Sequence, residues 1–120
     1  KLDNFSKQLY LNINQLKEMD RAGMHIGCHG INHTQWSPLS NIRQKNEVIE
    51  SKNFFKDKKI NIRDFSVCYP WGSYNVQSYQ IMKKLGIKFA LTSNHGNFNS
   101  DYEINRFKLP RFDANYFSKI

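Results

Sequence analysis

The first part of the chain places apolar residues at the spacing of an α-helix. Leu16, Met19 and Ala22 share one face, and the asparagine at position 12 or 14 can cap the beginning of such a helix. Gly23 follows as the kind of C-terminal glycine at which helices commonly end. The pattern therefore predicts a first helix over about residues 12–22.

Two further helices are predicted downstream of the first. The second begins at Ser37 or Ser40 and runs to about Lys58. Its apolar stripe consists of Ile42, Val48, Ile49, Phe54 and Phe55. The third begins after an asparagine cap, Asn75, and ends at Gly86.

Short apolar runs between the helices are typical of buried strands, and they cover residues 24–28, 65–69 and 88–92. Residues 106–112 have the pattern of a last extended segment. Helices and strands that alternate along a chain point to an α/β fold with a parallel sheet or barrel. A length of 120 residues allows one such domain at most.

The unusual residues of the chain follow the predicted strands. His29 and His33 come after the first strand, residues 69–72 after the second, and His95 after the third. In parallel α/β folds, ligands bind at the carboxyl ends of the strands. The pattern therefore predicts a functional site at that edge of the sheet.

Charge and cysteine content narrow the class of protein. The formal net charge is +8, from 18 Lys and Arg against 10 Asp and Glu, which fits a lysine-rich soluble surface or an anionic partner such as nucleic acid. No apolar run approaches the roughly 20 residues of a membrane span. Cys28 and Cys68 are too few for a disulfide scaffold, and we expect buried free thiols.

His29 and His33 form a His-x-x-x-His pair, a spacing that would put both imidazoles on one face of a helix. The glycines at positions 27 and 30 favour a loop instead, in which two rings can still converge on one metal ion. Catalytic zinc normally has three protein ligands, and no carboxylate here holds a comparable position after a strand. Spacing alone leaves both a metal site and a coincidental pair open.

The turn at residues 70–75 leads into the third helix. Its backbone N–H groups can hold an anion or a developing oxyanion, and Trp71 and Tyr74 can stack on a sugar face. The alternative is a turn and helix cap whose aromatic side chains cover the edge of the core. For His25 we favour a satisfied core residue over a second partner for the site, and we expect His95 at the surface.

Taken in order, these segments resemble the motifs of the polysaccharide deacetylase family, the metal-dependent carbohydrate de-N-acetylases. Residues 22–33, AGMHIGCHGINH, resemble the family's aGHEIGSH-[ST]-x-x-H stretch. Residues 65–75, FSVCYPWGSYN, resemble fayPYGsYn. Residues 86–92 and 106–111 resemble GykaAlt and fRLPR. The resemblance covers nearly the whole chain.

Three departures from the family pattern stand out. Gly30 replaces the usual Ser or Thr after the first histidine, and His25 replaces a common Glu or Gln. A Leu-His motif, which supplies the usual acid of the family, is missing from the sequence.

The resemblance implies a deformed (β/α) barrel and a divalent metal ion, usually zinc, with His29 and His33 as ligands. In the family, the third ligand and the catalytic base are an Asp-Asp pair on the first strand, and no Asp-Asp occurs in this sequence. We therefore expect residues 1–120 to be a single incomplete domain that lacks the opening strands and is inactive by itself.

The resemblance also implies a reaction, the metal-assisted hydrolysis of N-acetyl groups on a glycan. The backbone N–H of Trp71 would help to hold the oxyanion, and Arg111 is expected to orient the base carboxylate or, alternatively, to form a surface ion pair. Tyr69, Pro70, Trp71 and Tyr74 are expected to bind the substrate.

Two other functions remain open at this point. One is a glycan-binding module of the same fold without turnover, and the other is a basic nucleic-acid-binding domain, which rests on charge alone. The resemblance favours an N-acetylated glycan over nucleic acid as partner, and the bacterial cell envelope or the outside of the cell as location. Because an incomplete sheet exposes a strand edge and apolar surface, we also expect self-association.

Overall fold

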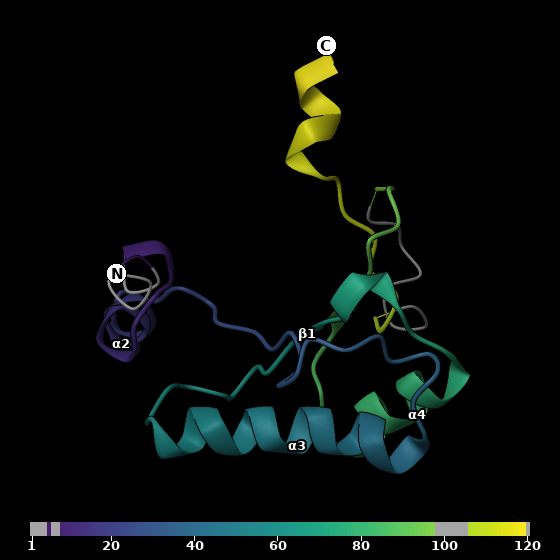
Figure 1. The fold of residues 1–120 in the computed structure, drawn as a ribbon, viewed down its shortest axis with the longest axis horizontal. Helices are drawn as coiled ribbons and strands as arrows, with labels where there is room; N and C mark the ends of the chain where they lie inside the picture. Colours follow the sequence, from purple (N-terminus) through teal and green to yellow (C-terminus); the bar gives the residue numbers. More distant parts are fainter. Residues whose placement is uncertain (1–4, 6–7, 98–105, 120) are drawn as a thin grey trace.

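Helices and short parallel strands make up the computed structural model, which describes residue 5, residues 8–97 and residues 106–119 (Figure 1). The elements are α2 (Ile13–Arg21), α3 (Asn41–Asp57), β1 (Val67–Cys68), the 3₁₀ turn η1 (Pro70–Gly72), α4 (Val76–Lys84), β2 (Ala90–Leu91) and η2 (Ala114–Lys119).

The strands form a small parallel sheet. β1 pairs with β2, with Val67 opposite Ala90 and Cys68 opposite Leu91. One parallel bridge on each side widens the pairing, from Cys28 to Val67 and from Leu91 to Leu109. Parallel pairing is therefore confirmed, and so is the extended segment near residue 109, whereas closure into a barrel stays a prediction.

The predicted buried strand at residues 24–28 is buried only at its end. Met24 is 55% exposed, whereas Cys28 is 3% exposed. Within the described residues, the only β-bridge of this segment is the one at Cys28. The prediction of a buried strand is therefore wrong for residues 24–27, because an apolar run is buried only where a neighbouring segment covers it.

The helix ends lie where the sequence predicts them. Asn12 caps α2 and Asn75 caps α4, and each forms a capping box with the third residue of its helix. Ser40 caps α3 by accepting the backbone N–H of Arg43. Gly23 and Gly86 follow α2 and α4 with φ angles of +83° and +65°, in the left-handed region that glycine adopts without strain.

The buried face of α3 differs from the predicted apolar stripe. Ile42 is 73% exposed and Phe54 is 36% exposed. The fully buried positions of the helix are Gln44, Glu47, Val48 and Ser51. Polar residues can occupy this face because hydrogen bonds to the cap of α4 and to the loop after Cys28 compensate for their burial.

The core lies between this face of α3, helix α4 and the sheet. Its largest members with almost no exposure are Trp36, Tyr69, Met82, Ile87, Val48 and Val67. Trp36 meets Tyr69 edge to face, with ring centroids 5.6 Å apart. Tyr69 follows β1, so this contact ties the core to the edge of the sheet where the histidines lie.

Helix α2 stands apart from this core (Figure 1). None of its residues is buried. The backbone N–H of Asn61 donates to Asp20 Oδ2 at 3.1 Å, a polar link between α2 and the segment before β1. Leu9, Tyr10 and Leu11 precede α2 and are each more than half exposed.

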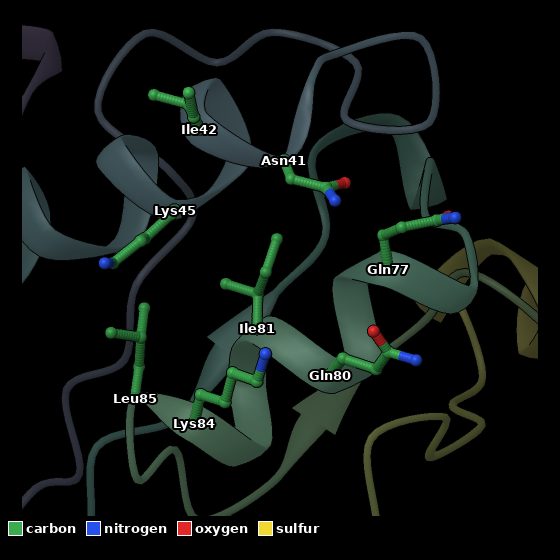
Figure 2. A pocket seen from close by; sticks show the side chains of 8 residues that line it. All are labelled: Asn41, Ile42, Lys45, Gln77, Gln80, Ile81, Lys84 and Leu85. Carbon is green, nitrogen blue, oxygen red and sulfur yellow. The ribbon is translucent and has the colours of Figure 1, made fainter.

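A cavity of about 290 Å³ lies between α3 and α4 (Figure 2). Ile81 and Leu85 of the α4 region form its apolar part, and the amides of Asn41, Gln77 and Gln80 surround them. Lys45 and Lys84 are its charged residues. None of these residues follows a strand, so the cavity is separate from the histidine loop.

The free thiols predicted for both cysteines are confirmed. Cys28 is buried, and this burial raises the pKa of its thiol, whereas Cys68 is only half-buried. Among the described residues, no helix combines the length and the apolar character needed to span a membrane.

Candidate functional site

The loops that follow the parallel strands come together at one edge of the sheet. His29 follows Cys28, which bridges to β1, and η1 follows β1 directly. The indole N–H of Trp71 in η1 donates to the backbone carbonyl of His33 at 3.2 Å. This hydrogen bond joins the two loops that the sequence singled out.

The ring of His29 is held in one tautomer by the backbone of β1. Its Nδ1 lies 2.8 Å from the carbonyl oxygen of Cys68. Because a carbonyl oxygen can only accept a hydrogen bond, Nδ1 carries the proton. In the neutral ring Nε2 is then unprotonated, which is the state in which histidine binds a metal ion.

His33 lies next to His29, as a converging loop requires. The ring centroids are 4.9 Å apart and the ring planes are inclined by 53°. His33 has a φ angle of +53°, and its ring also lies 5.3 Å from that of Trp71. Both histidines are exposed, so their rings are open to a ligand.

The pair alone does not complete a metal site. In the part of the chain that the structure describes, no third His, Cys, Asp or Glu joins these histidines to form a possible metal-binding group. Two imidazole nitrogens on one loop fit a zinc ion, since zinc accepts histidine nitrogen readily. The two histidines therefore fit a zinc ion as two of its ligands, and further ligands would be needed to complete the site.

The loop between the two histidines rests on a carboxylate of α3. Glu47 Oε2 accepts the backbone N–H groups of Ile31 and Asn32, at 2.9 and 3.1 Å. Glu47 Oε1 accepts the side-chain amide of Asn32 at 2.7 Å. Burial by itself raises the pKa of Glu47, but the donors from Asn32 and Ile31 outweigh it, and the pKa is lowered.

Sequence reasoning did not single out Glu47. In the sequence it is one of several charged residues of the predicted second helix, and nothing marks it among them. Hydropathy assigns such a residue to the solvent face, and only the position of the loop shows why it is buried.

The turn η1 places Trp71 beside the histidines. Trp71 has a φ angle of +59° and is 67% exposed. Pro70, just before it, is buried. Ser73 Oγ accepts the backbone N–H of Ser37 at 3.0 Å, so the turn is anchored to the segment before α3. The oxyanion role of the Trp71 backbone N–H stays a prediction.

The predicted substrate residues differ in accessibility. Tyr69 is fully buried, and its hydroxyl donates to the carbonyl of Phe107 at 3.0 Å. Tyr74 is half-buried and lies 4.9 Å from Tyr69, ring centroid to ring centroid. With Pro70 buried as well, only Trp71 and Tyr74 offer side-chain surface to a glycan.

Arg111 lies near the same edge of the sheet. Its backbone N–H donates to the carbonyl of Asn94 at 2.9 Å. Burial raises the pKa of the Cys68 thiol, and the positive charge of Arg111 acts in the opposite direction. The predicted role of the Arg111 guanidinium in orienting a base stays a prediction.

The two other histidines lie outside this pair. His25 is exposed, so the favoured prediction of a core histidine is wrong in its burial, although its Nε2 lies 2.8 Å from Ser66 Oγ. Its ring stacks on Phe89, with ring centroids 5.8 Å apart, and it stays exposed because no neighbouring segment that the structure describes covers residues 24–27. His95 is at the surface, as expected, beside Phe112 and Tyr116.

Comparison with known sequences points to one family of proteins. The family model described as "Polysaccharide deacetylase" matches residues 6–90. The chain is 28% identical over 103 residues to "Putative polysaccharide deacetylase YxkH" of Bacillus subtilis (strain 168). The matched region covers 83% of this chain and 37% of that protein.

A solved structure gives the same result. The chain matches "Streptococcus pyogenes deacetylase PplD in complex with acetate" with a TM-score of 0.76 and 29% sequence identity, over 85% of this chain and 44% of that one. The chain thus spans less than half the length of these two relatives. Because the family model covers more than half of its residues, the chain belongs to the polysaccharide deacetylase family.

Proposed function

We propose that the protein removes N-acetyl groups from a glycan by metal-dependent hydrolysis, with His29 and His33 as ligands of a divalent ion, zinc. The observation that carries the proposal is the hydrogen bond between His29 Nδ1 and the Cys68 carbonyl, which leaves Nε2 free for a metal ion. The adjacent ring of His33 offers a second nitrogen from the same loop.

The remaining ligand and the base belong to the proposal as well. Hydrolytic zinc sites commonly use three protein ligands and one open position for water. The sequence has no Asp-Asp pair, and the chain covers 37% and 44% of the two relatives. We propose that a third ligand and a carboxylate base come from protein outside these 120 residues.

The residues of this chain would act on the substrate around the metal ion. His29 and His33 would hold the zinc ion, which when bound would lower the pKa of its water and polarise the acetamide carbonyl. The backbone N–H of Trp71 would donate to the developing oxyanion, and Arg111 would orient the base carboxylate. The exposed face of Trp71, next to His33, would stack on a sugar ring. A location at the cell envelope stays a prediction.

This function can be tested by measuring the acetate that the full-length protein releases from N-acetylglucosamine oligomers. We expect release by the wild type, loss of it in His29→Ala and His33→Ala, and retention of it in His95→Ala, which removes an exposed imidazole outside the pair. Equal activity in all variants would refute the site assignment. Oligomer binding without acetate release would favour the glycan-binding module instead.

A further inference from the structure

Three residues separate His29 from His33, and the carboxylate of Glu47 binds two of these three, Ile31 and Asn32. Glu47 receives three N–H donors, two from the backbone of Ile31 and Asn32 and one from the Asn32 side chain. The residue is 6% exposed. A charged acceptor with several neutral donors forms stronger hydrogen bonds than a neutral acceptor does, so the loop is firmly attached to α3.

This attachment controls the direction of the chain between His29 and His33. Hydrogen bonds from two consecutive backbone N–H groups to one oxygen fix the Gly30–Ile31 and Ile31–Asn32 peptide planes, which lie between the two histidines. His33 then takes a φ angle of +53°, and its ring lies 4.9 Å from that of His29. A rotation of those planes would therefore move the His33 ring away from its partner.

Gly30 shows how closely the loop lies against the carboxylate. It has a φ angle of +76°, and a Cβ atom placed on it would be 2.8 Å from Glu47 Oε2. The backbone at this position is thus in direct contact with Glu47. The hydrogen bonds and this close approach together leave the loop little freedom.

We propose that Glu47 is a positioning residue for the histidine pair. It holds His33 at the distance from His29 that two ligands of one ion require, without touching the ion or the substrate itself. The inference rests on the proposed function and adds to it a residue from α3. Groups that hydrogen-bond a metal ligand directly typically change metal affinity about 10–100-fold when they are removed, and we expect an effect of this order from Glu47, which acts through the loop backbone.

The test compares Glu47→Gln with Glu50→Gln in the full natural length of the protein. Glu50 lies three residues further along α3 and is exposed, so this control removes the same charge from the same helix. For each variant we would measure the zinc affinity and the visible spectrum of the cobalt(II) form, which reports ligand geometry. Circular dichroism would check separately that the variants are folded to the same extent. Amide exchange at Ile31 and Asn32 is followed without metal.

We expect Glu47→Gln to weaken zinc binding about 10–100-fold, to change the cobalt spectrum and to speed exchange at both amides, with Glu50→Gln like the wild type. Unchanged affinity and spectrum in Glu47→Gln would overturn the inference. So would a loss of affinity no larger than the loss of folded protein, since that indicates a structural role. A wild type that binds no zinc would instead refute the proposed function, and this inference with it.

Discussion

At the scale of single residues, backbone atoms define the chemistry of the site. The Cys68 carbonyl selects the tautomer of His29, and the Trp71 indole holds the carbonyl of His33. The side chains of His29 and Trp71 are therefore each oriented by a hydrogen bond to a backbone carbonyl of another segment. The Cys68 carbonyl leaves Nε2 of His29 as the ring nitrogen open to a ligand, which the four-residue spacing does not predict.

Substitution of Gly30 tests the close contact of the loop with Glu47. Gly30→Ala must accept a positive φ and a Cβ at 2.8 Å from Glu47 Oε2, whereas Gly86→Ala meets the same kind of backbone with nothing within 4 Å. We expect Gly86→Ala to lower the free energy of unfolding by about 1 kcal/mol and Gly30→Ala to lower it by at least about 1 kcal/mol more. Urea unfolding measures both. Equal losses would contradict the contact.

The lowered pKa of Glu47 predicts a pH dependence of stability in the metal-free protein. A carboxyl with a lower pKa when folded contributes stability above its unfolded pKa, and this contribution is lost as pH falls through the folded pKa. As pH falls from about 7 to about 3, the stability difference between Glu47→Gln and the wild type should therefore become smaller. Urea unfolding at both pH values checks this; a pH-independent difference would contradict it.

At the scale of elements, α3 and α4 meet through a buried polar cluster. Ser78 Oγ donates to Gln44 Oε1 at 2.7 Å and accepts the backbone N–H of Asn75 at 3.0 Å. Gln44 and Ser78 have no exposed surface. The cap of α4 is therefore part of the helix–helix contact, which places η1 next to the histidine loop.

Ser78→Ala tests this cluster against a matched capping box at the surface. In α4 the change removes the hydroxyl that donates to the buried oxygen of Gln44 and accepts the backbone N–H of Asn75. The loss of these two hydrogen bonds should lower the free energy of unfolding by about 2 kcal/mol. In α2, Gln15→Ala removes the corresponding acceptor of Asn12, but that box is exposed and water replaces it, so the cost should stay below about 1 kcal/mol. Thermal unfolding compares the two variants, and equal losses would argue against a buried network.

The elements that the sequence predicts correctly are those whose ends depend on interactions between residues close in the sequence. The caps Asn12, Ser40 and Asn75 act within a few residues of themselves, so their helices are found at the predicted places. The buried face of α3 depends instead on long-range partners, and the exposed Ile42 could not be identified from its spacing.

The same distinction applies to the candidate site. Proximity of His29 and His33 follows from a short loop after a strand, and the family motif marks both. Glu47 is supplied by a helix, and the Cys68 carbonyl by a neighbouring strand. Such partners carry no sequence signal of their own because the tertiary fold alone brings them to the loop.

At the scale of the whole molecule, apolar side chains remain exposed at both ends of the described chain. One group lies in the segments that flank α2 in the sequence, and the other lies in and just before η2, which extends away from the sheet (Figure 1). The exposed members are Phe5, Leu9, Tyr10, Leu11 and Met24 in the first group, and Phe112, Tyr116 and Phe117 in the second. Clusters of this kind favour association with further protein surface.

We therefore predict that the 120-residue chain self-associates. Leu9→Glu combined with Leu11→Glu should reduce the association, since both side chains are more than half exposed near α2. Ile42→Glu is the control, because Ile42 is exposed on α3 outside both groups. Sedimentation over a range of concentrations measures the effect. A wild-type chain that stays monomeric throughout would contradict the prediction.

Zinc affinities of the full-length protein and of three histidine variants decide whether His29 and His33 bind a metal ion. We expect one tight zinc site in the wild type and in His95→Ala. In His29→Ala and His33→Ala we expect a loss of zinc affinity that exceeds the roughly 10–100-fold effect of removing an outer hydrogen-bond partner. Wild-type affinity in both His29→Ala and His33→Ala would show that these histidines are not the ligands.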